Sequence, residues 1–186
     1  MRCFFESGEP ELEYAINDGK PHGFKLVWHG PGVLLSVEPY ARGLPHGVAK
    51  QWDDHGRLIG TYRMIRGTGV DLWRQPRDRG KPYLSEVLYL KNGRPHGFEW
   101  WLEEDQKRVF IERHWKDGEL HGIEREWNGE RHLSRGYPKY HVAGKQVTKR
   151  QYLKAGSLDS TLPPFRLQDN KPGRRFPSEI EKHLAR

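Results

Sequence analysis

The sequence predicts a mostly β fold: a single open, twisted antiparallel meander of β-hairpin repeats, followed by short C-terminal helices. Two observations carry this prediction, a recurring glycine frame and an apolar–polar alternation between the glycines. Most steps of the frame are 11 or 13 residues, so one repeat spans about 24 residues and contains two turns. The frame glycines are Gly8, Gly19, Gly32, Gly43, Gly56, Gly67, Gly80, Gly93, Gly118 and Gly129.

The first strand of a repeat follows a His-Gly pair. Phe24, Leu26 and Trp28 occupy alternate positions there, and later repeats show the same spacing. Period-two alternation of large apolar residues is typical of strands. The dipeptides Asn92-Gly93 and Asp117-Gly118 suit the positive φ angles of tight hairpin turns. Each repeat is therefore predicted to be one hairpin, and successive hairpins extend the meander.

The third repeat departs from the pattern. After Gly67 the sequence reads Thr68-Gly69-Val70 in place of Pro-His-Gly, and Pro76 stands where other repeats carry Trp. The frame is then two residues longer before Gly93. Because proline removes a donor from the strand ladder, we expect a bulge or distortion here.

The chain is predicted to divide at residue 136. Residues 1–136 form the array of about five repeats, and residues 137–186 form a basic cap and an extended tail. Thr148 and Gln151 match a capping box, which predicts a helix near 149–155, and Ser178 opens a second capped helix that runs to about 185. Residues 156–177 are punctuated by Pro, Asp and Gly and are expected to be extended or loose. A tail that folds back could cover the last edge strand or one face of the sheet, because repeat arrays need caps, and a tail that is free to bind is the alternative.

Composition narrows the class of protein. The chain has 186 residues, the size of one ordinary domain, with 34% hydrophobic and 12% aromatic residues. This balance favours a thin structure in which Trp and Tyr supply most of the buried surface. Cys3 is the only cysteine, so an internal disulfide and a cysteine-based zinc site are excluded; we expect it to lie at a frayed end and not to act as a nucleophile. No apolar run resembles a signal peptide or a membrane span, so a cytoplasmic location is expected.

Positive charge is concentrated in one segment. Residues 131–158 contain no Asp or Glu, and their seven Lys and Arg residues equal the net charge of +7. Tyr137, Tyr140 and Tyr152 lie among these cations, and basic residues mixed with aromatic ones are typical of nucleic-acid binding. A solvated face, a docking site for the acidic N-terminus and a site for an acidic protein are equally compatible readings. The seven cations are Arg131, Arg135, Lys139, Lys145, Lys149, Arg150 and Lys154.

Four His-Gly pairs raise the question of a metal site. Equivalent residues of adjacent hairpins lie two strands apart, about 9–10 Å, whereas zinc needs ligand nitrogens at about 2.0–2.1 Å. The histidines therefore cannot share one metal ion, and we predict that they are structural, with a hydrogen bond to a neighbouring turn. No metal or cofactor is predicted. The signature residues are Gly19, His22, Gly23, Gly43, His46, Gly47, Gly93, His96, Gly97, Gly118, His121 and Gly122.

Catalytic motifs are not evident in the sequence. The acidic groups Asp53-Asp54 and Glu103-Glu104-Asp105 fall at predicted turns, where solvation explains them. No nucleophile elbow, Walker A loop or dinucleotide-binding fingerprint is present. We therefore predict that the protein is not an enzyme.

The signature G-x-P-H-G, followed by an aromatic residue and then a turn glycine, resembles the MORN repeat, and more specifically the bacterial variant of YwqK-type antitoxins. The resemblance covers roughly residues 8–136. It implies an open sheet of consecutive hairpins that acts as a binding surface without catalysis. Bacterial members of the YwqK type are associated with neutralising toxins, and eukaryotic MORN proteins with scaffolding and acidic phospholipids.

Adjacent tryptophans mark the candidate binding surface. A strand sends Trp100 and Trp101 to opposite faces, so at least one should lie on the less protected side, and Trp115 lies on the following strand. Exposed Trp and Arg side chains are common binding anchors. We predict a surface that comprises these three tryptophans and Arg131, Arg135, Lys145, Lys149, Arg150 and Lys154.

The leading functional hypothesis is a non-catalytic protein-binding module. Its specific form is an antitoxin- or immunity-like neutraliser, and its partner would be a toxin or a scaffold client. The alternative is binding of a polyanion, either nucleic acid or acidic phospholipid, through residues 131–158. An enzyme with an unrecognised site is the third hypothesis and the least supported.

Overall fold

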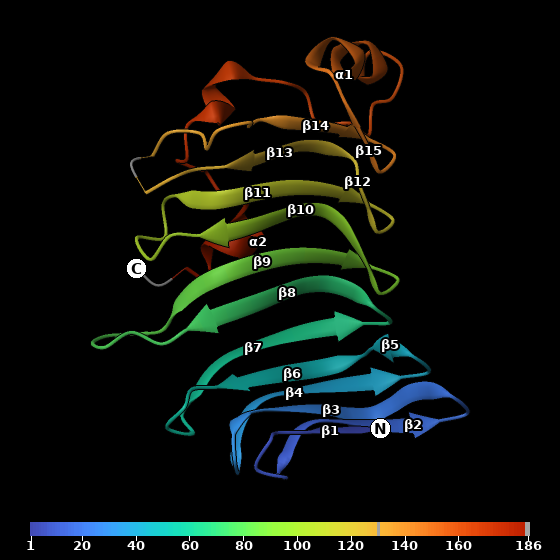
Figure 1. Cartoon of the computed structure of the whole chain (residues 1–186), viewed down its shortest axis with the longest axis vertical. Coiled ribbons are helices and arrows are strands. Elements are labelled where there is room, and N and C mark those ends of the chain that lie inside the picture. Colours follow the sequence, from blue (N-terminus) through green and yellow to red (C-terminus); the bar gives the residue numbers. More distant parts are fainter. Residues whose placement is uncertain (130, 185–186) are drawn as a thin grey trace. The chain divides into compact units, whose positions relative to one another are not determined.

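The computed structural model describes residues 1–129 and 131–184. Over these residues it confirms the predicted fold class, an open antiparallel meander of fifteen strands with few and short helices (Figure 1). The chain divides into two compact units. The first unit comprises Met1–Tyr83 and Leu90–Arg94, and the second comprises Leu84–Tyr89 and Pro95–Arg186.

The first unit is built from consecutive antiparallel hairpins in the order β1-β2-β3-β4-β6-β7-β8, with β5 paired to β4. Both ends of β9 (Tyr83–Lys91) belong to this unit and its middle to the second. The other strands are β1 (Arg2–Phe4), β2 (Pro10–Asn17), β3 (Lys20–Gly30), β4 (Val33–Ala41), β5 (Leu44–Pro45), β6 (Gly47–Trp52), β7 (Leu58–Ile65) and β8 (Thr68–Gln75).

The second unit continues in the order β10-β11-β13-β14-β15, with β12 paired to β11. A helical C-terminal segment follows the last strand. The elements are β10 (Arg94–Leu102), β11 (Val109–Lys116), β12 (Glu119–Leu120), β13 (Gly122–Glu126), β14 (Lys139–Val142), β15 (Lys145–Val147), α1 (Lys149–Gly156), a 3-10 helix (Leu167–Asn170) and α2 (Ser178–Glu181).

Tight turns with two positive φ angles join the hairpins. Asn92 and Gly93 have φ of 51° and 76°, as the Asn-Gly pair predicts. Arg42 and Gly43 have φ of 53° and 85°, although arginine has no intrinsic preference for this region. The frame glycine and the turn geometry therefore decide the conformation, and the residue before the glycine adopts a positive φ whatever its type.

The histidines of the signature hydrogen-bond to the next turn of the array. In each case a histidine Nδ1 accepts from a backbone N–H of the first turn residue of the following hairpin. Because this nitrogen accepts a hydrogen bond from the backbone, each histidine links two neighbouring hairpins. Separately, no cluster of three or more metal-binding side chains occurs in the described residues. The pairs are His22 with Arg42 (3.4 Å), His46 with Arg66 (3.1 Å), His96 with Asp117 (3.4 Å) and His121 with Ala143 (3.1 Å).

A second hydrogen bond strengthens each of these links. The turn glycine donates its N–H to the residue that precedes the histidine, as Gly43 does to the Pro21 carbonyl (2.8 Å) and Gly118 to that of Pro95 (2.8 Å). The third repeat lacks histidine but keeps the link, because the Thr68 hydroxyl accepts from the N–H of Asn92 at 3.2 Å. We call this series of bonds the turn ladder.

The third repeat places its added residues in a loop. Strand β8 is continuous from Thr68, and the added residues lie in the loop 76–82 that begins at Pro76. Proline ends the strand because it has no N–H to donate, so the insertion falls outside the ladder. Register shifts are seen in regular repeats, at Gln51/Trp52 and Trp101/Leu102.

Both ends of the sheet differ from the prediction. Cys3 is exposed but lies in β1, paired with Leu12, so this end is not frayed as expected. The pattern also does not stop at Gly136, because β14 and β15 form a further hairpin whose turn is Ala143-Gly144. The predicted boundary at 136 therefore cuts through the second unit. The sequence hid this hairpin because Gly144 follows Gly129 by 15 residues, outside the steps of 11 and 13.

The C-terminal helices lie where the sequence predicts them, but their caps and ends match the prediction only in part. Helix α1 starts after Thr148, which forms the predicted capping box with Gln151. Helix α2 lies where expected, but its N-cap is Pro177 without a side-chain hydrogen bond, and it ends at Glu181. Residue 185, its predicted end, lies outside the described residues. In the part of the chain that the structure describes, no helix has the length and apolar character needed to cross a membrane.

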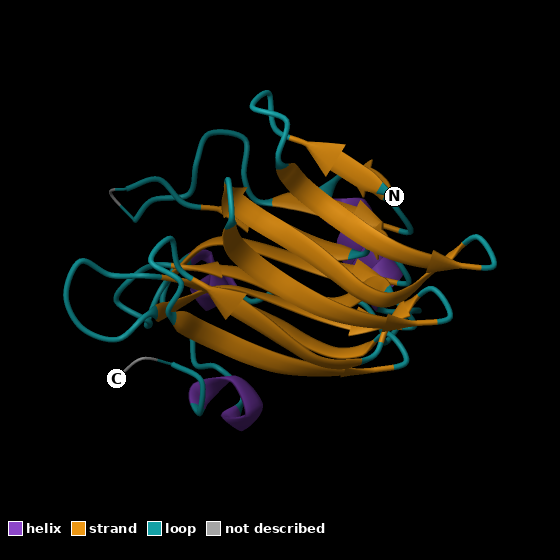
Figure 2. Ribbon diagram, turned by 90° about the horizontal axis from the view of Figure 1, so that it is seen from below, coloured by secondary structure: helices purple, strands orange, loops and turns teal. Residues whose placement is uncertain are grey.

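Residues 156–177 are not loose. The 3-10 helix lies within them, and Gly173 forms a β-bridge with Arg108 at the start of β11. The helices lie against the layer of strands and not within it (Figure 2). Tyr152 of α1 and Leu162 are buried with Ile123 and Tyr140 of the sheet. The tail therefore folds back onto the second unit, as a cap would.

Candidate functional site

Two faces of the second unit have different surroundings. Strand alternation places Trp100 on one face and Glu99 and Trp101 on the other, as the sequence predicts. We call the face of Trp100, Glu112 and Arg125 the covered face, because the C-terminal segment packs on it. We call the face of Glu99, Trp101, Arg113, Trp115 and Glu124 the open face.

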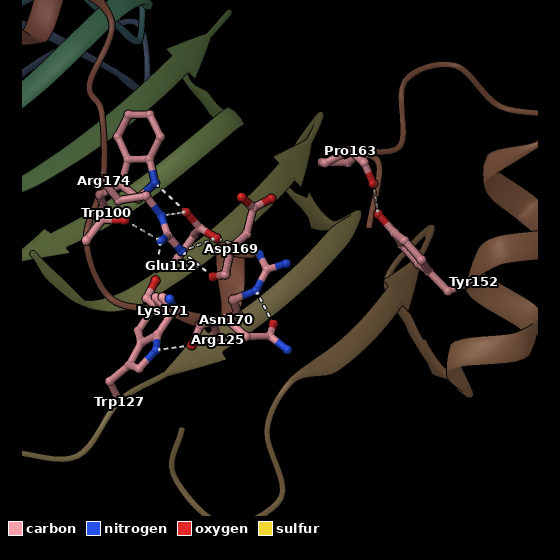
Figure 3. A network of polar contacts seen from close by, with 11 residues as sticks. Trp100, Glu112, Arg125, Trp127, Tyr152, Pro163, Asp169, Asn170, Lys171 and Arg174 are labelled. Atoms are coloured by element: carbon pink, nitrogen blue, oxygen red, sulfur yellow. Dashed lines mark hydrogen bonds and ion pairs between the residues drawn. The ribbon is translucent and has the colours of Figure 1, made fainter. Parts of the chain in front are cut away.

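A buried ionic network holds the C-terminal segment on the covered face (Figure 3). Glu112 accepts hydrogen bonds from Arg125 (2.6 Å), from Arg174 of the tail (2.7 Å) and from the indole of Trp100 (2.9 Å). Burial alone would raise the pKa of Glu112, but the hydrogen bonds and charge of Arg174, with the charge of Arg125, hold it below its usual value. The carboxylate is therefore ionised and fully paired.

The network removes Trp100 from the predicted binding surface. Its side chain is 6% exposed, and the ring of Phe176 packs edge-on against it with 5.5 Å between ring centroids. Nearby, the Trp127 indole donates to the carbonyl of Asn170 at 2.9 Å. The tail thus covers the aromatic residues that the sequence left open to a partner, because sequence spacing does not reveal where a tail returns.

On the open face one carboxylate fixes two indoles. Glu99 is buried, and its two oxygens accept from the Nε1 atoms of Trp101 and Trp115, each at 2.7 Å. Arg113 also donates to Glu99, at 3.3 Å. Both tryptophans keep part of their surface exposed. With three donors on Glu99, this arrangement orients aromatic rings and does not suit proton transfer.

Alternating charges extend this arrangement across the sheet. Arg113 donates to Glu124 at 3.1 Å, and the Nε2 atom of His141 lies 3.3 Å from the other oxygen of Glu124. Lys139 pairs with Glu124 in the strand register and lies over the Tyr137 ring at 4.2 Å. The open face therefore combines two fixed indoles with a row of paired charges.

Sequence reasoning missed Glu99 and Glu124, although a signal was available. Both stand two residues after the signature glycine, at the same position of their repeats. The equivalent residues of the first unit are Lys25, Ala49 and Asp71. Aligning the repeats by column, and not only by turn, would have identified one position that always faces the same side of the sheet.

The basic segment runs through a loop, a hairpin and a helix. Arg131 and Arg135 are exposed in the loop before β14, whereas Lys145 lies beyond the far end of that strand. Arg150 and Lys154 are exposed on α1, and Lys149 lies over the Phe165 ring at 3.8 Å. The cations that the sequence places in one window are thus divided between two ends of β14 and a helix.

In comparisons with known proteins, no family model, curated protein or solved structure matches the chain.

Proposed function

We propose that the protein is a non-catalytic protein-binding module whose open face receives a partner protein around Trp101 and Trp115. The observation that carries the proposal is the pair of part-exposed indoles held by the buried carboxylate of Glu99. Large aromatic side chains dominate binding energy at interfaces, and rings that are already fixed lose little entropy on binding.

The narrower form of the proposal is that the partner is a toxin that this chain neutralises. The resemblance of its repeats to those of YwqK-type antitoxins supports this form. The chain has a net charge of +7 and a pI of about 9.5, so it does not mimic nucleic acid. We therefore expect contact with a surface other than a basic nucleic-acid-binding site.

Polyanion binding through residues 131–158 remains the competing proposal. The cations of this segment lie on separate elements of the second unit. This arrangement supports polyanion binding less strongly than the sequence alone did. The two proposals differ in their salt dependence, because release of counterions from a polyanion makes log Kd rise linearly with log salt concentration. Charge reversal at Lys149 and Arg150 would weaken polyanion binding and leave binding at the open face unchanged.

Site-specific crosslinking tests the open face directly. We would place p-benzoylphenylalanine at Ile111, which pairs with Trp101 across the strands, and in a control chain at Phe24, an exposed residue of the first unit. The expected result is a protein crosslinked from Ile111 and not from Phe24. Its affinity for purified wild-type and variant chains would then be measured.

The variants separate anchoring from folding. Trp101→Ala should weaken binding by about 30-fold, as expected of a central aromatic anchor worth roughly 2 kcal/mol. Glu99→Gln should weaken it less, because an amide has one acceptor oxygen and can hold only one indole. Glu119→Gln, at an exposed site on the same unit, is the charge-matched control. Retention of RNA, DNA or anionic vesicles without any protein specific to Ile111 would refute the proposal.

A further inference from the structure

The first unit contains a hollow of about 330 Å³ on the side of the sheet that carries Asp71. Glu38, Tyr40, Tyr62 and Asp71 form its polar lining. Leu44 and Met64 are among its apolar lining residues. This volume is of the size that accommodates a small organic group, and the lining combines an apolar wall with a few polar groups, as ligand sites do.

Asp71 is the least satisfied group in the hollow. Its Oδ1 atom is buried and accepts no hydrogen bond from the described residues, while the carboxylate bonds to the Tyr62 hydroxyl. Burial, followed by the charge of Glu38, raises the pKa of Asp71 to about 6. At neutral pH the group is therefore mainly ionised. A buried carboxylate in this state is unfavourable unless a positive charge pairs with it.

Lys25, the nearby cation, is already engaged. Its ammonium group donates to Glu38 at 3.0 Å, and the hydroxyl of Tyr40 lies 3.4 Å from the other oxygen of the same carboxylate. Lys25 and Glu38 cancel each other in charge, so Asp71 leaves the hollow with one negative charge in excess. A divalent metal ion is a poor occupant, because no group of three or more His, Cys, Asp or Glu side chains that could hold one occurs in the described residues.

We propose that this hollow binds an organic cation, an ammonium or guanidinium head on an alkyl stem. The head lies against Asp71 between the two tyrosines, and the stem lies along Leu44 and Met64. This is the chemistry of a Lys or Arg side chain and also of a free alkyl amine. The site lies on the first unit and is independent of the binding proposed for the open face.

Affinity should depend on pH. A cation binds the ionised form of Asp71, so binding lowers the pKa of this group and affinity falls as the pH drops through about 6. The groups that face Asp71 are Glu38 and Tyr40 of β4, Lys25 of β3 and Tyr62 of β7. Burial, followed by the charge of Glu38, raises the pKa of Tyr40, and burial, followed by the charge of Asp71, raises that of Tyr62. Both tyrosines therefore stay neutral over this range.

The test uses the full chain and n-butylguanidinium as the probe, with NMR detection of the Asp71 carboxyl carbon. Uncharged n-butylurea, n-butyrate and calcium chloride are the control ligands. We expect saturable binding of n-butylguanidinium alone, with a downward shift of the Asp71 titration. Equal shifts with n-butylurea would overturn the proposal, because they would show that charge is not recognised.

Variants locate the site. Asp71→Asn keeps the shape of the side chain and should weaken binding at least tenfold, about the contribution of a charged hydrogen bond. Glu11→Gln, an exposed carboxylate on β2, changes the net charge equally and should alter affinity less than twofold. Unchanged affinity in Asp71→Asn would overturn the proposal. Wild-type protein at pH 5 provides a second measurement that needs no variant, and undiminished affinity there would also count against it.

Two further ligands distinguish the source of the cation. A blocked Gly-Arg-Gly peptide represents a side chain presented by a protein, and n-butylammonium represents a free amine. If the peptide binds at least as tightly as n-butylguanidinium, the hollow takes a side chain from a partner chain. If only the free amines bind, the ligand is a small molecule. Failure of all three cations would overturn the proposal without bearing on the open face.

Discussion

Glu112 in the second unit and Asp71 in the first are both carboxylates within the sheet, but their partners differ. Glu112 accepts from Arg125, Arg174 and Trp100, and its side chain is 4% exposed. Asp71 bonds to Tyr62 and keeps one buried oxygen without a donor. The difference comes from the C-terminal segment, which supplies Arg174 to Glu112. Glu112 is therefore fully paired, whereas Asp71 keeps an uncompensated charge, on which the proposed cation site rests.

Of the substitutions considered, removing Arg174 should change the stability of the fold most. Arg174→Met leaves the buried carboxylate of Glu112 with Arg125 as its remaining positive partner. Breaking a buried ion pair in this way costs about 3–5 kcal/mol of stability. Arg175→Met, at the exposed neighbouring position, is the matched control and should cost less than about 0.5 kcal/mol. Unfolding in denaturant measures both. A loss below about 1 kcal/mol for Arg174→Met would show that the tail contributes little.

Asp71→Asn should raise the free energy of unfolding, whereas Arg174→Met should lower it. Because the folded pKa of Asp71 is raised to about 6, its protonation stabilises the fold below the unfolded pKa, and this contribution is lost as the pH rises through about 6. The variant should therefore be more stable than wild type at pH 7.5, by roughly 3 kcal/mol. The difference should shrink toward pH 4.5. A pH-independent difference would mean that Asp71 is not the titrating group.

The smallest effect concerns the same signature histidine in the two units. His46 is exposed, whereas His121 is 3% exposed and its Nε2 atom lies 3.1 Å from the Thr161 hydroxyl. His46→Ala should cost about 0.5–1 kcal/mol, because water can replace the lost acceptor, and His121→Ala about 2 kcal/mol. Thermal unfolding compares them. Equal losses would show that burial adds nothing to the turn ladder.

The repeating part of the fold could be predicted from the sequence because it follows local rules. Glycine spacing located the turns, alternation located the strands, and Thr148 with Gln151 located α1. The hairpin at Ala143-Gly144 was missed because Gly144 does not fall on the glycine frame, at 15 residues after Gly129. Local patterns therefore identify elements only where the chain repeats itself.

The candidate sites depend on contacts that no local pattern shows. That Phe176 would cover Trp100 follows from the return path of the tail, which is a tertiary event. That Glu99 would hold Trp101 and Trp115 required the strand register between β10 and β11. The prediction that Trp100 and Trp101 point to opposite faces is confirmed, because it needs only the strand itself.

The turn ladder connects one hairpin to the next through backbone groups of the receiving turn. His46, for instance, accepts from the main-chain N–H of Arg66 and makes no demand on its side chain. The turn residues Arg42, Asn92, Asp117 and Ala143 accordingly differ in size and charge while their φ angles stay within a few degrees of 50°. The residue before each turn glycine is thus a position where substitutions are expected to leave the framework intact. Selection can alter the surface there, or append another hairpin, without redesigning the joint that carries it.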